Sequence, residues 1–209
     1  TTAELLKYAD LQMAAEAFLA NPDGSLRTDL KQALIDGNKH ASKFTATQAD
    51  NFLAHWEVVA QKPNTATGFS GTLFRCIQDD PATGAKKGEL VMSFRSTEFI
   101  DDAARDNQAT NTLEIKETGF AWGQLRDMQD WYRELTSSGG PLGGGQTFSV
   151  TGYSLGGHLA TAFNMMYAAA KETFTFNGAG IGGIDPTTTL KTLVDAFATD
   201  SRRDHTADI

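Results

Sequence analysis

The segment around Ser154 has the residue types and spacing of a serine nucleophile. Gly152-Tyr153-Ser154-Leu155-Gly156 matches the pattern G-x-S-x-G, and it lies between a predicted strand and a predicted small-residue helix. A sharp turn at the serine leaves no room for larger side chains two positions away on either side. The serine then lies at a helix N-terminus, which favours developing negative charge. The pattern predicts acyl transfer through Ser154, with the Leu155 amide as an oxyanion donor. The alternative is a glycine-rich turn that only needs small residues.

A serine nucleophile needs a base, and the base needs a carboxylate that orients it. With this strand-turn-helix motif, the acid and then the base follow the serine along the chain. His158 lies one turn along the predicted helix, so we expect it to pack or to hydrogen bond there. His205 has the right order and is the candidate base within the sequence. The aspartates between the serine and His205 are Asp185, Asp195, Asp200 and Asp204.

The elements after residue 146 must position this serine. Strand and helix patterns alternate there, over 146–151, 155–170, 172–177 and about 187–198. This alternation predicts a parallel sheet covered by helices. No further strand is predicted after residue 177, although strand ends normally hold the acid and the base. We therefore expect a single domain over 1–209 that is the N-terminal part of a longer hydrolase, with its acid and base beyond Ile209 or on a partner chain.

The earlier part of the chain reads as helices followed by a hairpin. Apolar spacing predicts helices over 3–20, about 26–36 and from a capping box at Thr47–Asp50 to about 61. The stretches 68–78 and 89–95 are rich in β-branched and aromatic residues, and turn-forming residues at 79–84 join them. A helix is predicted over 119–136, and a flexible glycine-rich loop follows at 137–145.

Composition bounds the function classes. The chain has 209 residues, of which 40 % are hydrophobic, and this is typical of a globular domain. A formal net charge of -8 argues against nucleic acid as a partner. One cysteine, Cys76, excludes a disulfide framework and a thiolate metal cluster, but leaves the compartment open. Apolar runs are short, so no segment is expected to span a bilayer.

Four blocks between residues 68 and 183 resemble, in the right order, the class 3 lipase family of α/β-hydrolases. Val91–Glu98 resembles the family strand F-R-G-[ST], with Ser96 in the glycine position and Asp101 or Asp102 as the aspartate that follows. Thr118–Trp122 resembles the H-x-G-F segment without its histidine. The remaining blocks are Gly152–Gly157, where Tyr153 replaces the histidine of G-H-S-L-G-G, and Phe174–Ala179, which resembles T-F-G-x-P.

The resemblance implies an α/β-hydrolase-type, mostly parallel sheet flanked by helices, with a helical N-terminal extension. It implies Ser154 as nucleophile and the amides of Leu155 and Thr97 as oxyanion donors. Thr97 could instead cap a helix near 98–105. Arg95 is interpreted as a structural charge tied to a carboxylate, and 98–118 as a lid or substrate-flanking region. The family likeness is to bacterial lipases and phospholipases, which favours a secreted protein.

The function expected from these residues is hydrolysis of lipid or phospholipid acyl esters through an acyl-enzyme on Ser154. This chemistry needs neither a metal nor an organic cofactor, and the protein could touch a lipid surface transiently. One alternative is a carboxylesterase, thioesterase or acyltransferase that uses the same turn. Another is a catalytically inactive hydrolase-like binding domain, because Ser96 replaces glycine and a base is missing.

Overall fold

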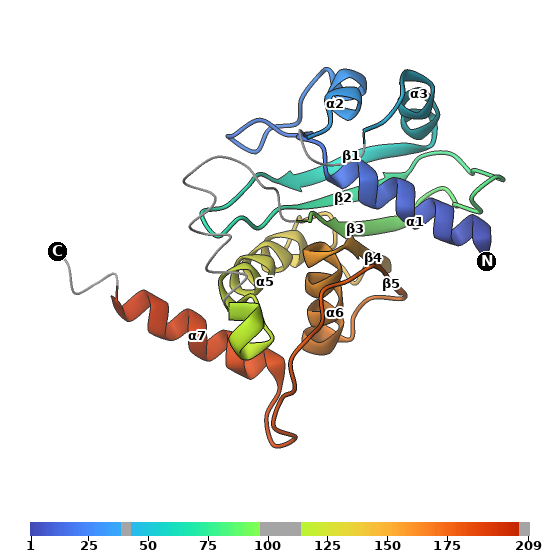
Figure 1. Cartoon of the computed structure of the whole chain (residues 1–209). Helices are drawn as coiled ribbons and strands as arrows, with labels where there is room; N and C mark the ends of the chain where they lie inside the picture. The colour runs from blue at the N-terminus through green and yellow to red at the C-terminus, as the bar shows by residue number, and fades with distance from the viewer. Residues whose placement is uncertain (39–42, 97–113, 205–209) are drawn as a thin grey trace.

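A five-stranded mixed sheet forms the centre of the part of the chain that the structure describes (Figure 1). The computed structural model describes residues 1–38, 43–96 and 114–204, the last five by their backbone alone. The strands have the same order in the sheet as in the sequence. They are β1 (Trp56–Lys62), β2 (Gly71–Cys76), β3 (Leu90–Phe94), β4 (Phe148–Tyr153) and β5 (Thr173–Phe176).

The sheet has an antiparallel half and a parallel half. β1, β2 and β3 pair antiparallel, whereas β3, β4 and β5 pair parallel. The register places Phe94 opposite Gly152 and Tyr153 opposite Phe176. The carboxyl ends of β3, β4 and β5 therefore lie along one edge of the sheet, here called the carboxyl edge. The mostly parallel sheet expected from sequence is correct only for the half that contains Ser154.

Helices cover both faces of the sheet (Figure 1). On one face are α1 (Thr2–Ala15), α2 (Leu30–Asp36) and α3 (Ala46–His55). On the other are α5 (Trp122–Thr136), α6 (Leu155–Tyr167) and α7 (Leu190–Asp204). Because side chains alternate along a strand, Leu73 and Met92 pack under α5 and α6, while Phe74 and Val91 pack under the first set. Two buried cores result, one on each side of the sheet.

The third predicted helix is wrong in its second half. The helix ends at His55, and the next residues form β1, so the N-terminal third is not purely helical. Apolar side chains three to four residues apart suggested that the helix continues past His55. The same spacing also occurs where a helix is followed directly by a strand. Trp56 and Val58 are buried in one core, and Val59 packs against the other, as the period of two in a strand requires. The expected N-terminal extension is thus part of the sheet layers.

The capping box also lies earlier than predicted. Thr45, not Thr47, is the N-cap: its hydroxyl accepts from the Gln48 amide at 3.3 Å, and the Gln48 side chain accepts from the Thr45 amide at 2.9 Å. The hairpin of β2 and β3 and the strand–helix alternation from β4 onward are confirmed. The first helix ends at Ala15 instead of residue 20, and Glu16 is its C-cap.

Candidate active site

Ser154 lies at the carboxyl edge, in a tight turn between β4 and α6. Its backbone has φ 52° and ψ -116°, a conformation that non-glycine residues rarely adopt and that costs about 1–3 kcal/mol. Two hydrogen bonds hold the turn: the Ser154 amide donates to Phe176 O at 3.0 Å, and Ser154 O accepts from the Ala179 amide at 3.0 Å. The sharp bend predicted from the sequence is confirmed.

The glycines around Ser154 allow backbone to touch backbone. A Cβ on Gly152 would overlap the carbonyl of Gly156, and a Cβ on Gly156 would overlap the carbonyl of Phe94. The predicted need for glycine at both positions is therefore confirmed. Gly157 adds a contact that the sequence did not indicate, because a Cβ there would lie 2.7 Å from the Cα of Gly178. The N-terminus of α6 is thereby fixed against the end of β3.

The hydroxyl of Ser154 and the amide of Leu155 lie together at the N-terminus of α6. Ser154 is the N-cap of α6, yet its side chain makes no capping hydrogen bond, and the residue is partly exposed. Leu155 is the first helical residue, where an amide has no acceptor within the helix. The helix dipole adds partial positive charge at this point. An anionic oxygen next to Ser154 would be stabilised there.

His158 holds three segments together beneath the turn. The ring is fully buried, Nδ1 lies 3.0 Å from Gly180 O, and Nε2 lies 3.4 Å from the Ala121 amide. A carbonyl only accepts and an amide only donates, so these partners assign the neutral Nδ1–H form. Burial lowers the pKa of His158. The predicted packing and hydrogen-bonding role is confirmed, and both ring nitrogens are occupied.

The end of β3 is held by side chains. Arg95 is buried, donates from Nη2 to Asn64 Oδ1 at 2.6 Å, and places its guanidinium 4.5 Å from the centre of the Phe18 ring. Ser96 donates both its amide and its hydroxyl to the carboxylate of Glu16. Sequence reasoning missed Glu16, although a charged residue among the buried alanines at the end of α1 was a usable signal.

Some of the other predicted site residues lie outside the part of the chain that the structure describes, and others lie within it. Thr97, His205 and the two candidate aspartates Asp101 and Asp102 lie outside the described residues, as does most of the 98–118 segment; only 114–118 is seen, as a helical turn. Asp185 is exposed and accepts from the amide and hydroxyl of Thr187. Among the residues that the structure describes, no histidine hydrogen bonds to Ser154.

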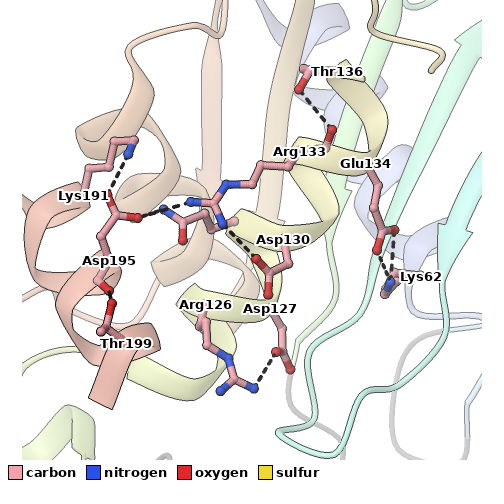
Figure 2. Close-up of polar contacts among 11 residues, drawn as sticks. Lys62, Arg126, Asp127, Asp130, Arg133, Glu134, Thr136, Lys191, Asp195 and Thr199 are labelled. Atoms are coloured by element: carbon pink, nitrogen blue, oxygen red, sulfur yellow. Dashed lines mark hydrogen bonds and ion pairs between the residues drawn. The ribbon is translucent and has the colours of Figure 1, made fainter. Parts of the chain in front are cut away.

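Asp195 lies in a polar cluster between α5 and α7 (Figure 2). Its carboxylate accepts from Lys191 at 2.7 Å, from Arg133 at 3.3 Å and from Gln129 at 2.8 Å. The Lys191 hydrogen bond is the main cause that lowers the pKa of Asp195. This aspartate ties two helices together, and none of the histidines that the structure describes is bonded to it.

The described residues hold neither a cluster suited to a metal ion nor a helix suited to a membrane. No cluster of three or more histidine, cysteine or acidic side chains could hold a metal ion there. None of the helices in that part of the chain is long and apolar enough to cross a membrane.

Comparison with known proteins gives no assignment. No family model matches the chain, and no curated protein has significant similarity to it. The likeness to class 3 lipases therefore rests on the sequence motifs quoted above, and the functional argument rests on the geometry at Ser154.

Proposed function

We propose that the protein is a serine ester hydrolase with an α/β-hydrolase-type fold and Ser154 as its nucleophile. The observation that carries the proposal is the backbone of Ser154, which is strained at φ 52° at the N-terminus of α6 while its hydroxyl caps nothing. Strain of this kind persists only where the surrounding structure enforces it, and it is common at active sites. Here the glycine contacts of Gly152 and Gly156 enforce it.

The reaction follows from this arrangement in two halves. Ser154 Oγ attacks the ester carbonyl, its proton passes to a base, and the base returns that proton to the leaving alcohol as the acyl-enzyme forms. Water then attacks the acyl-enzyme, gives one proton to the base, and releases the acid as Ser154 is reprotonated. The Leu155 amide, together with Thr97, would stabilise the oxyanion, at about 3 kcal/mol for each donor.

The catalytic acid and base are proposed to come from outside the described residues. His205 is the candidate within the sequence; the others are a segment beyond Ile209 or a partner chain. His158 does not fill this role, because its two ring nitrogens already bond to Gly180 and Ala121. A base on a neighbouring loop would reach Ser154 from the exposed side of the turn.

A fluorophosphonate probe tests the assignment directly. We expect the folded wild type to be labelled on a peptide that contains Ser154, and Ser154→Ala to be unlabelled. Ser137→Ala, in the exposed loop after α5, is a matched serine control and should label like the wild type. Absence of label on the folded wild type would overturn the hydrolase proposal and favour the inactive binding domain.

Lipid or phospholipid esters are the proposed substrates, because the motifs resemble those of class 3 lipases. A series of p-nitrophenyl esters from acetate to palmitate measures this preference. We expect kcat/KM to rise with acyl length and hydrolysis to increase on emulsified substrate. A preference for acetate would identify a carboxylesterase instead, and a preference for acyl thioesters would identify a thioesterase.

A further inference from the structure

The strand β5 lies at the edge of the sheet, and its outer side pairs with no strand in the part of the chain that the structure describes (Figure 1). In a parallel pair, alternate residues of a strand bond to the neighbouring strand. The Val150 amide donates to Glu172 O, so Glu172 and every second residue after it face β4. The backbone groups of Thr173 and Thr175 therefore point away from the sheet, and no described residue bonds to them. Their N–H and C=O groups are available to another strand.

The two edge strands of the sheet differ in how they are protected. β1 carries the charged residues Glu57 and Lys62, and its register with β2 shifts between Val58 and Ala60. Charges and bulges of this kind keep foreign strands from pairing with an edge. β5 has the sequence Thr-Phe-Thr-Phe, with no charge, no proline and no register shift against β4. Its open edge is therefore suited to strand addition.

Apolar side chains lie beside this open edge. Phe174 and Phe176 point to the face that α1 covers, and both are only half-buried. Phe174 stacks on Tyr8 of α1, with 4.1 Å between the ring centres. Leu5 lies one helical turn before Tyr8 and is 50 % exposed. A strand added to β5 would cover part of this apolar surface, which favours association.

The residues of β5 match a second copy of the same strand. When two copies run antiparallel with Phe174 opposite Phe174, Thr173 of each copy faces the partner's Thr175. Each threonine pair can then exchange two N–H···O bonds, so all the outward backbone groups are used. The two Phe174 side chains meet at the position without hydrogen bonds, where side chains are closest. No like charges face each other, because Glu172 lies opposite the partner's Phe176.

We propose that a second copy of this chain pairs antiparallel with β5, so that Phe174 lies on the two-fold axis and two five-stranded sheets join into one. A copy of β5 supplies the alternation that the open edge needs, and it brings no charge into the contact. Antiparallel pairing places the two Ser154 turns on opposite edges of the joined sheet. The interaction goes beyond the proposed function and does not depend on it.

Light scattering after size-exclusion chromatography of the protein as encoded in full measures the association. We expect the wild type to have twice the mass of one chain at high concentration and to dissociate on dilution. Thr175→Pro removes one outward N–H from each copy, a change that an edge strand tolerates, so the dissociation constant should rise at least about 10-fold. A wild type that stays a single chain at every concentration overturns the proposal and leaves the edge to a different strand.

Thr175→Val is the matched control. It keeps the N–H and suits a strand, so the dissociation constant should stay within about 3-fold of the wild type. A folded Thr175→Pro variant that associates like the wild type overturns the proposal. If thermal melting shows that Thr175→Pro does not fold, Thr175→Lys decides, because a lysine on an edge opposes strand pairing. Weaker association of that variant supports the proposal, and unchanged association overturns it.

A disulfide between copies tests the register of the two strands. Phe174→Cys should cross-link on mild oxidation, because opposite residues at the position without hydrogen bonds have Cα atoms about 4.5 Å apart. The native Cys76 is buried and does not compete. Thr187→Cys, in the exposed loop after β5, accounts for random collisions and should cross-link far more slowly. Equal rates would overturn the proposal; light scattering of the Thr175 variants decides if Phe174→Cys does not fold.

Discussion

Two neighbouring strand ends at the carboxyl edge are built in different ways. The end of β4 turns on glycines, and its close contacts run from backbone to backbone through Gly152, Gly156 and Gly157. The end of β3 is held by side chains: Ser96 bonds to Glu16, which is 80 residues away in sequence. The glycines that allow the turn at the end of β4 lie close together in the sequence. The contact that holds the end of β3 forms only when the chain has folded. Each end therefore responds differently to substitution.

The largest expected effect on stability is at the end of β4, here called the glycine-built end. Gly156→Ala should lower the free energy of unfolding by about 3 kcal/mol, because the new Cβ overlaps a strand carbonyl that cannot move aside. Ser96→Ala, at the side-chain-built end, should cost only about 1 kcal/mol, the scale of one hydrogen bond. Urea denaturation of both variants measures the difference.

Gly180→Ala is the control for the glycine substitution. A Cβ at Gly180 would meet nothing within 4 Å, so this change should leave stability within about 0.5 kcal/mol. Equal losses for Gly156→Ala and Ser96→Ala would contradict the distinction between the two strand ends.

Relief of the backbone strain at Ser154 should stabilise the protein, in contrast to the loss of stability expected for Gly156→Ala. Ser154→Gly should raise the free energy of unfolding by about 1 kcal/mol, because glycine adopts φ 52° without steric cost but loses more chain entropy on folding. Ser154→Ala keeps the strain and should give no gain in stability, and neither variant should show the proposed ester hydrolysis. Thermal melts of the pair measure this; a more stable Ser154→Ala variant than Ser154→Gly would show that the turn is not strained.

These strand ends also show how far the sequence could predict the structure. The bend at Ser154 was predictable because its causes, Gly152 and Gly156, lie only four residues apart, between a strand and a helix. The contact between Glu16 and Ser96 was not, since nothing local fixes which helix end meets which strand end. β1 was missed for a related reason: Trp56 and Val59 fit a helical spacing, and only pairing with β2 decides for the strand. The direct pairing of β2 with β3 was local and was predicted.

His158 makes the glycine-built end sensitive to acid. Burial lowers its pKa, so the unfolded chain, with a histidine pKa near 6.5, binds a proton more readily than the folded protein. The free energy of unfolding should therefore fall as the pH drops below about 6.5, and stop falling below the folded pKa. His158→Asn should remove this slope, as measured by denaturation between pH 5 and 8.

The control for this titration is Phe120→Leu. Phe120 packs against the His158 ring, with 6.2 Å between ring centres, so the change loosens the same site but keeps the histidine. It should lower stability at every pH and retain the acid slope. A slope that survives in His158→Asn would place the titrating group elsewhere.

The smallest expected effect is on the free energy of unfolding when a partly exposed carboxylate is changed to an amide. The same change at a buried carboxylate gives the comparison. Asp195→Asn in the α5–α7 cluster (Figure 2) should cost less than about 1 kcal/mol at neutral pH, because the side chains of its partners Lys191 and Arg133 are about half exposed and water screens them. The pKa of Asp195 is lowered in the fold, so even this contribution should disappear as the pH falls through that pKa.

Glu16→Gln should cost more than Asp195→Asn in a side-by-side denaturation at pH 7, because it leaves Ser96 and Arg95 facing an amide without water to replace the lost charge. Equal costs would mean that the end of β3 is held no more firmly than an exposed ion pair.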